Sequence, residues 1–265
     1  MPWAAVLPGP RRRCRADVLT APLLSTTQLA LPLRLPAPAG FDRFIPGDNP
    51  EVIAALQDWC RHEGARSLFL HGGRASGKSH LLQSAAARMA ALGRRVLYVP
   101  LDSADLTPMV LDDLEQLDAV LLDTLEAVAG RRDWEEAIFH LYNRLQHTQG
   151  GRLLVAARLP PGHLELQLAD LRSRLSACPA YLLKGLDDAG RTRLLQHGAA
   201  HRGLRLNDAV VTYVLTRCPR DPAWLTSFLD RLDEATLAEQ RAPTVPFIGK
   251  LLDSLLPAED DARTA

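Results

Sequence analysis

An eight-residue stretch at positions 72–79 constrains the fold of this chain more than any other feature. It matches the phosphate-binding loop pattern G-x-x-x-x-G-K-[ST] at every required position. Glycines let the backbone turn so that successive N–H groups converge on an anionic diphosphate, while the lysine reaches the outer phosphates and the hydroxyl binds Mg²⁺. The predicted phosphate-binding residues are Gly72, Gly73, Arg74, Ala75, Ser76, Gly77, Lys78 and Ser79.

The flanking sequence predicts the structural context that such a loop needs. Residues 67–71 form a short apolar run typical of a buried strand, and residues 78–92 are rich in Leu, Ala, Gln and Met, which favours a helix. The helix N-terminus itself attracts phosphate. A chance match in a glycine-rich turn is the alternative, and the strand–loop–helix context argues against it.

Apolar strands and helical patterns alternate around this motif. Further strands are expected at residues 95–99, 119–123, 152–157 and 181–183, and helices at residues 51–59, 106–117 and 134–146. Nearly continuous apolar strands between helices indicate a parallel sheet covered on both faces. We therefore predict an α/β fold, with a P-loop nucleotide-binding domain over residues 41–185.

The pattern changes after this domain. Helical spacing without an intervening strand is found at residues 187–201, 207–217, 223–239 and 246–255. These helices predict a small all-helical lid domain over residues 186–256, followed by a frayed tail at residues 257–265.

Composition excludes several classes of function. Lys and Arg balance Asp and Glu at 31 each, which argues against DNA binding by bulk charge. The four cysteines, Cys14, Cys60, Cys178 and Cys218, show neither metal-ligand spacing nor a disulfide pattern, so a cytoplasmic, reducing environment is expected. No apolar run is long enough to span a bilayer.

The N-terminal region divides into two segments. Residues 1–27 are basic and then mildly apolar, but Pro22 and Ser25 interrupt the apolar part, so we expect a disordered extension rather than a signal peptide. Prolines then favour an extended tether over residues 28–40. Its apolar anchors suit either a groove on a partner or an edge-strand position on the chain's own domain.

Two further positions carry candidate chemistry. Asp123 ends the third predicted strand, where P-loop proteins hold Mg²⁺, and the next residue is Thr124, where hydrolysing members often carry an acid. Arg172 and Arg174 precede the last strand. They are either a solvated basic turn or the source of an arginine finger, which reaches the γ-phosphate of a neighbouring subunit.

The motifs together resemble those of AAA+ ATPases related to the bacterial replication initiator DnaA, over residues 28 to about 252. The segments that carry the resemblance, besides the phosphate loop, are QLALPL (28–33), FDRFIPGDN (41–49), LYVPLD (97–102), WEEAIFHLYNRL (134–145), DLRSRL (170–175) and VPFIGKLL (245–252). The closest resemblance is to the regulatory branch of this family, which lacks the initiator's DNA-binding domain.

The resemblance implies partners and site residues. It implies that the N-terminal peptide docks on the β sliding clamp of DNA polymerase III, through Gln28, Leu29, Leu31, Pro32 and Leu33. It implies that Arg174 is a finger acting in trans on ATP bound to DnaA, which turns replication initiation off. The expected cofactors are ADP or ATP with Mg²⁺ at Ser79 and Asp123, and we also assign Phe44 and His80 to the nucleotide site. Contact with DNA is expected to be mainly indirect, a homodimer is compatible with the resemblance, and no membrane is involved.

Three departures from the family pattern weaken self-catalysed hydrolysis. They are Thr124, the apolar pair before Arg158 after the fourth strand, and Ala223 where a lid arginine is expected, with Arg217 and Arg220 out of register. We therefore expect a weak ATPase that activates hydrolysis elsewhere. The alternatives are an autonomous DnaA-like or helicase-loader-like ATPase, a P-loop small-molecule kinase and a DNA-binding module.

Overall fold

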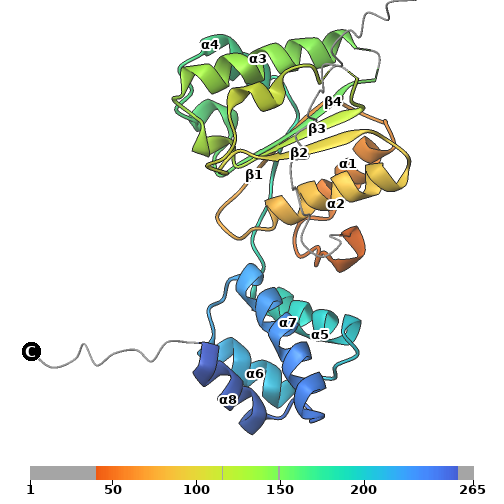
Figure 1. The fold of residues 1–265 in the computed structure, drawn as a ribbon, viewed down its shortest axis with the longest axis vertical. Coiled ribbons are helices and arrows are strands. Elements are labelled where there is room, and N and C mark those ends of the chain that lie inside the picture. Colours follow the sequence, from red (N-terminus) through yellow and green to blue (C-terminus); the bar gives the residue numbers. More distant parts are fainter. Residues whose placement is uncertain (1–39, 115, 149, 256–265) are drawn as a thin grey trace, which may run out of the picture. The chain divides into compact units, whose positions relative to one another are not determined.

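A five-stranded parallel sheet lies at the centre of the phosphate-loop part of the chain (Figure 1). The computed structural model describes residues 40–114, 116–148 and 150–255. The strands are β1 (Ser67–His71), β2 (Val96–Pro100), β3 (Ala119–Asp123), β4 (Arg152–Ala157) and β5 (Ala180–Leu182), in the spatial order β2-β3-β4-β1-β5. The predicted P-loop α/β fold is confirmed.

The strand register brings the candidate residues to one edge of the sheet. His71, the last residue of β1, is level with Ala157 of β4, and Asp123 of β3 is level with Pro100 of β2. In parallel sheets, ligands bind outside the carboxyl ends of the strands, where the chain order reverses. The phosphate loop follows β1 at this edge, so the topology itself places the site.

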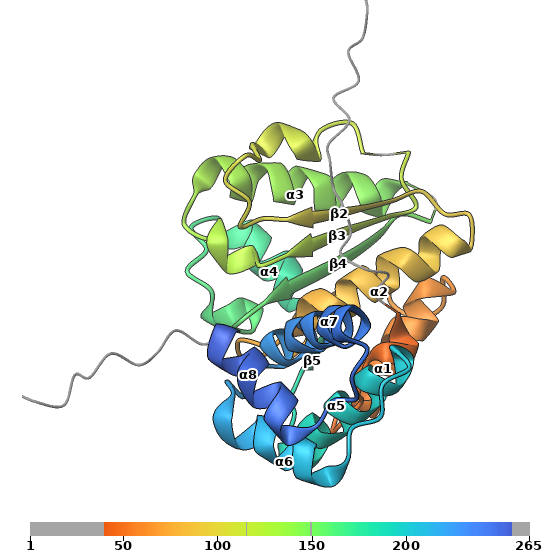
Figure 2. The ribbon, with the colours of Figure 1, turned by 60° about the horizontal axis from the view of Figure 1, so that its bottom comes forward.

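Helices cover both faces of the sheet (Figures 1 and 2). The helices α1 (Pro50–Cys60) and α2 (Lys78–Ala91) pack on one face, and α3 (Arg132–His147) and α4 (Ala169–Ser176) on the other. The apolar side of α3 repeats at helical spacing and is fully buried, which fixes this helix on the sheet. Short 3₁₀ turns lie at Phe41–Arg43, Pro108–Leu111, Leu125–Ala127 and Pro161–His163.

Two expectations differ from the structure. The helix expected over residues 106–117 is reduced to the 3₁₀ turn Pro108–Leu111. Pro108 disfavours a helix that includes the residues before it, and the backbone leaves helical geometry at Asp112 (ψ 150°) and Asp113 (φ 54°). The segment around Arg172 and Arg174, for which no helix was expected, is the helix α4, since Leu171 and Leu175 anchor it in the core one helical turn apart.

Four helices follow the sheet and have a core of their own. They are α5 (Asp188–His201), α6 (Asp208–Arg217), α7 (Pro222–Glu239) and α8 (Val245–Leu255). Side chains cap three of them: Asp187, Asn207 and Asp221 each accept a backbone N–H within the first turn. No helix of the described residues has the length and apolarity that a bilayer crossing requires.

Candidate nucleotide-binding site

The phosphate loop connects β1 to α2 and depends on two glycines. Gly77 is the N-cap of α2 with φ 98°, a left-handed conformation that side chains disfavour. A Cβ added to Gly72 would lie 2.3 Å from the carbonyl oxygen of Leu183, so the loop passes the β5 segment at a distance only glycine allows. The sequence pattern therefore reflects both backbone conformation and close packing.

Lys78 contacts the loop that precedes it. Its ammonium donates to the carbonyl oxygens of Gly72 at 2.7 Å and Gly73 at 2.8 Å. Burial lowers the pKa of Lys78, and the nearby carboxylates of Glu126 and Asp123 act in the opposite direction. The ammonium thus lies against the backbone carbonyls of the loop itself, and the lysine of a phosphate loop binds phosphate oxygens.

Asp123 is held rigidly at the end of β3. Its side chain is only 3% exposed. One carboxylate oxygen accepts the hydroxyl of Tyr98 at 2.8 Å, and the other accepts the backbone N–H of Thr124 at 2.9 Å. Burial, and then the negative charge of Asp123, raise the pKa of Tyr98, so the tyrosine stays a neutral donor. Sequence reasoning missed Tyr98, because its partner is 25 positions away.

The donor atoms around Ser79 and Asp123 suit Mg²⁺ held partly through water. Mg²⁺ typically keeps several waters and takes one or two carboxylates together with substrate phosphates. Among the residues that the structure describes, each oxygen of Asp123 accepts a single hydrogen bond and retains a lone pair for water. No cluster of three His, Cys, Asp or Glu within the described parts of the chain could hold a metal by itself. An ion here would therefore depend on phosphate oxygens, as in other P-loop sites.

The residues after Asp123 do not offer a free carboxylate. Thr124 has φ 58° and ψ 49°, a conformation that is uncommon for a β-branched residue. Both carboxylate oxygens of Glu126 bind Arg158, one at 3.0 Å from Nε and the other at 3.1 Å from the backbone N–H. Glu126 is therefore tied to the end of β4, and its carboxylate is paired with Arg158 rather than left unpaired beside Asp123.

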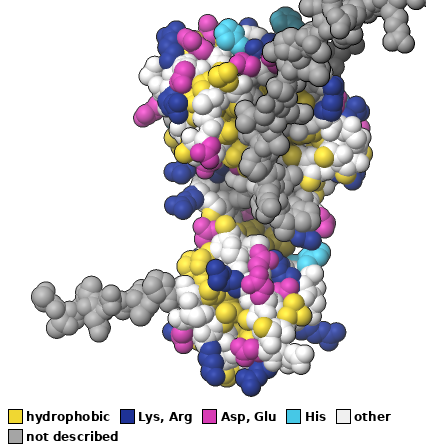
Figure 3. Space-filling model, in the orientation of Figure 1, with side chains coloured by type: hydrophobic (Ala, Val, Ile, Leu, Met, Phe, Trp, Pro, Cys, Tyr) yellow, Lys and Arg dark blue, Asp and Glu magenta, His cyan; other side chains and the backbone are white. Residues whose placement is uncertain are grey.

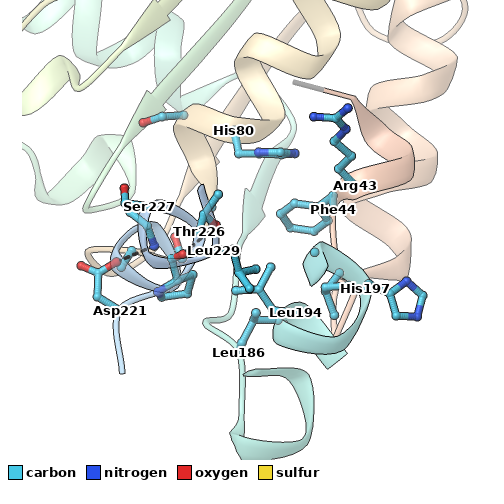
Figure 4. A pocket seen from close by; sticks show the side chains of 18 of the residues that line it. Arg43, Phe44, His80, Leu186, Leu194, His197, Asp221, Thr226, Ser227 and Leu229 are labelled. Atoms are coloured by element: carbon cyan, nitrogen blue, oxygen red, sulfur yellow. Dashed lines mark hydrogen bonds between the residues drawn. The ribbon is translucent and has the colours of Figure 1, made fainter. Parts of the chain in front are cut away.

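A pocket of about 750 Å³ lies against the phosphate loop (Figure 4). This volume falls in the usual range for small-molecule sites. Most of the predicted nucleotide residues line it: Phe44, Arg74, Ala75, Ser76, Gly77, Lys78, Ser79 and His80. Gly72 and Gly73 do not line it, and instead bind Lys78 through their carbonyls.

Phe44 and His80 form one side of the pocket (Figure 4). Their ring centroids are 5.8 Å apart, and the rings are tilted by 34°. Burial lowers the pKa of His80, so the imidazole is neutral at neutral pH. A flat apolar ring beside a neutral imidazole is suited to a heteroaromatic base.

The helices α5 and α7 supply lining residues that the sequence analysis did not identify. Leu194, His197, Gly198 and His201 lie at i, i+3, i+4 and i+7 on α5, so helical periodicity was the signal that could have found them. Figure 4 shows Asp221, Thr226 and Ser227, at the start of α7, on the side away from Phe44.

The lid arginine expected near position 223 is not there, although another lid arginine, Arg202 at the end of α5, lines the pocket and is paired with Asp230. Ala223 lines the pocket where an arginine is expected. Arg217 instead donates to the hydroxyl of Tyr213 at 2.8 Å, and Arg220 lies 3.5 Å from a carboxylate oxygen of Asp188. Neither of these arginines lines the pocket.

The two arginines of α4 have different surroundings. Arg172 donates a hydrogen bond to the carbonyl oxygen of Leu166, so its guanidinium is occupied by the chain's own backbone. Arg174 is exposed in the last turn of α4, and its guanidinium has neither a hydrogen bond nor an ion pair with any residue that the structure describes. Of the two, Arg174 is therefore the one available to an external anion.

The remaining predictions concern the surface and the tail. Acidic and basic side chains are interspersed on the face visible in Figure 3, in keeping with the zero net charge. The predicted clamp-binding residues, Gln28, Leu29, Leu31, Pro32 and Leu33, lie outside the described residues.

Comparison with protein families matches two models to consecutive parts of the chain. The model of the bacterial DnaA ATPase domain matches residues 35–181, and the model of the Hda lid domain matches residues 188–252. The first match ends within β5, and the second begins at the first residue of α5.

Solved structures with the same fold include DnaA and RuvB proteins. Domain III of DnaA from Thermotoga maritima is 20% identical with a TM-score of 0.69, over 84% of this chain and 99% of that chain. AMPPCP-bound DnaA from Aquifex aeolicus is 20% identical with a TM-score of 0.65, over 77% and 67% respectively. The RuvB Holliday junction branch migration motor of Thermotoga maritima is 18% identical with a TM-score of 0.61, over 82% and 72%.

These structures share the AAA+ fold with this chain, and the two family matches agree with the resemblance that its motifs carry. The DnaA match alone covers more than half of the 265 residues. The chain therefore belongs to the bacterial DnaA ATPase-domain family, and it carries an Hda-type lid domain after the sheet.

Proposed function

We propose that this chain is a negative regulator of replication initiation that promotes hydrolysis of ATP bound to DnaA. In this proposal it binds ADP in its own pocket, docks on the DNA-loaded sliding clamp through residues 28–33, and presents Arg174 to the partner's nucleotide. The pocket then binds ADP, while Arg174 separately activates hydrolysis of the ATP bound to DnaA.

One contrast within the site carries the proposal. Next to Asp123 the chain has Thr124, and the nearby carboxylate of Glu126 is bound at both oxygens by Arg158. Arg174, by comparison, is exposed on a helix whose other side is buried. A protein that supplies positive charge to another site needs the exposed arginine and does not need a hydrolytic acid of its own.

Nucleotide binding is supported by the pocket and by the family. A phosphate loop at a helix N-terminus, an adjacent aromatic ring and a cavity of suitable volume are all present. A structural relative, DnaA from Aquifex aeolicus, binds the ATP analogue AMPPCP. Lys78 would bind the phosphates, while Ser79 and Asp123 would hold Mg²⁺, which neutralises charge on the phosphate oxygens.

The finger acts by electrostatics and position. Negative charge spreads over the transferred phosphoryl group in the transition state, and an arginine supplied in trans raises the rate by about 10³–10⁵-fold. The planar guanidinium can bind two oxygens at once, which a lysine cannot. The required chemistry occurs on the partner's ATP, and this chain contributes the fixed cation.

The proposal includes a domain organisation and a location. Residues 41–185 form the nucleotide-binding domain, residues 186–256 the lid and residues 28–40 the clamp-binding tail. The protein acts in the cytoplasm, where replication takes place.

An autonomous ATPase is the second candidate, since Lys78, Ser79 and Asp123 are the residue types that P-loop proteins use for nucleotide and Mg²⁺. Steady ATP turnover by the purified chain alone, lost in Lys78→Ala, would favour this alternative.

The deciding experiment measures hydrolysis of ATP preloaded on DnaA. Four reactions are compared: DnaA alone, DnaA with this protein, DnaA with DNA-loaded clamp, and DnaA with both this protein and DNA-loaded clamp. We expect rapid hydrolysis only when both are present, and loss of the effect when Gln28, Leu29 and Leu31 are replaced by Ala. Equal hydrolysis with and without this protein would contradict the proposal.

A further inference from the structure

A buried carboxylate joins the helix that carries Arg174 to the loop after Asp123. Glu135 lies in the first turn of α3 and is 0% exposed. No ion pair of the described residues involves it, so its charge must be stabilised by hydrogen bonds.

Three backbone N–H groups supply those bonds. One oxygen of Glu135 accepts from Gly130 at 2.7 Å and from Gln167 at 3.1 Å, and the other accepts from Leu168 at 2.6 Å. A fourth hydrogen bond joins two of these donor residues directly: the side chain of Gln167 donates to the carbonyl of Gly130 at 2.8 Å.

These bonds fix the start of α4. Leu168 is the N-cap of α4, and its own side chain provides no cap. Glu135, which belongs to α3, caps α4 instead. Its negative charge lies at the N-terminal ends of both α3 and α4, where the helix dipoles favour a negative charge. The far end of α4 is attached through Cys178, whose thiol contacts the carbonyl of Arg174 at 3.4 Å.

We propose that Glu135 is a positioning residue for Arg174, which sets the place of α4 relative to the loop that follows Asp123. The inference rests on the proposed function, since it assigns Glu135 to the finger of that function. Glu135 touches no nucleotide in this scheme and acts only through α4.

The isosteric variant Glu135→Gln tests the inference. An amide has a single acceptor oxygen, so its NH₂ group must face at least one of the three N–H donors. We expect α4 to shift or loosen, and a displacement of about 1 Å can cost about 10²-fold in rate. The matched control is Glu136→Gln, because Glu136 is the next residue, with an exposed carboxylate paired to Arg132 at 2.7 Å.

The readouts separate positioning from general stability. In Glu135→Gln, the maximal rate of stimulated DnaA-ATP hydrolysis should fall by up to about 10²-fold, while the protein concentration for half-maximal stimulation and the ADP-induced thermal shift stay near those of the parent. Amide hydrogen exchange at residues 167–171 should speed up. In Glu136→Gln all four readouts should stay near the parent values.

A double variant links the effect to the finger. If Glu135 acts through Arg174, adding Glu135→Gln to Arg174→Ala should not lower the residual rate further. Additive losses, unchanged exchange at residues 167–171, or full stimulation by Glu135→Gln would each overturn the inference. Full stimulation by Arg174→Ala would instead show that the proposed function itself fails, so the two failures are distinguishable.

Discussion

At the scale of single residues, the contacts of Lys78 connect the loop's geometry to binding. Its ammonium donates to two loop carbonyls, and a bound diphosphate would offer charged oxygens in their place. The neighbouring backbone N–H groups at the start of α2 favour the same anion. Binding of nucleotide should therefore stabilise the folded protein through this one side chain more than through any other.

Lys78→Ala should abolish the rise in melting temperature that ADP produces. Saturating ligand stabilises a protein by mass action, by about 2.7 kcal/mol at a hundredfold excess over Kd. Thermal unfolding with and without ADP measures the shift, and Lys184→Ala, an exposed lysine outside the pocket, is the control. A full ADP shift in Lys78→Ala would contradict the assignment.

A matched pair of glycine variants tests the packing of the loop. Gly72→Ala should lower the free energy of unfolding by about 1–3 kcal/mol, because the new Cβ would lie 2.3 Å from the carbonyl of Leu183. Gly73→Ala should have little effect, since no atom lies within 4 Å of its added Cβ. Equilibrium denaturation measures both, and equal stability of the two variants would refute the close approach.

Residues whose roles depend on chain spacing were predictable from the sequence, whereas residues paired across the fold were not. The phosphate loop and Asp123 follow fixed patterns along the chain. The bonds from Tyr98 to Asp123 and from Arg158 to Glu126 join different strand ends, which become neighbours only when the sheet forms.

At the scale of elements, the length of a helix and the regularity of its apolar spacing decided whether the sequence could predict it. The helix α3 has several turns of regular apolar spacing, so the sequence identified it. The helix α4 has eight residues and only two buried apolar positions, so its pattern was too short to recognise. The segment 106–117 has apolar residues, but the extended Asp112 and the left-handed Asp113 (φ 54°) end it as a short 3₁₀ turn.

The cap of α5 provides a test at this scale. The side chain of Asp187 accepts the backbone N–H of Gly190 at 2.6 Å, so Asp187→Ala should cost about 1 kcal/mol of stability. Asp187→Asn should stay close to the parent, because Asn is an equally good N-cap. Urea unfolding of the three proteins gives the comparison, and identical midpoints for all three would exclude a capping role.

At the scale of the whole molecule, three partly buried histidines make stability depend on pH. Burial lowers the pKa of His62, His71 and His80 below the ordinary value near 6.5. The unfolded chain therefore binds protons more readily than the folded protein, and stability rises with pH in that range. The contribution is present above about pH 6.5 and is lost as the pH falls below it.

We expect the melting temperature without nucleotide to fall as the pH is lowered from 8 to 5. His80→Gln should flatten this dependence, because it removes one of the groups that gains a proton on unfolding. The variant His163→Gln, which changes an exposed histidine, should leave the curve unchanged. A pH profile of His80→Gln as steep as that of the parent would show that burial of His80 does not contribute.

The most direct test of the central claim is the rate of DnaA-ATP hydrolysis with DNA-loaded clamp and the Arg174→Ala variant. The account predicts that this variant binds ADP and clamp normally but loses stimulation, by up to the 10³–10⁵-fold that a finger contributes. Arg172→Ala should lose less, because Arg172 is bound to the carbonyl of Leu166, and Arg174→Lys should restore little. Stimulation by Arg174→Ala equal to that of the parent protein would contradict the account.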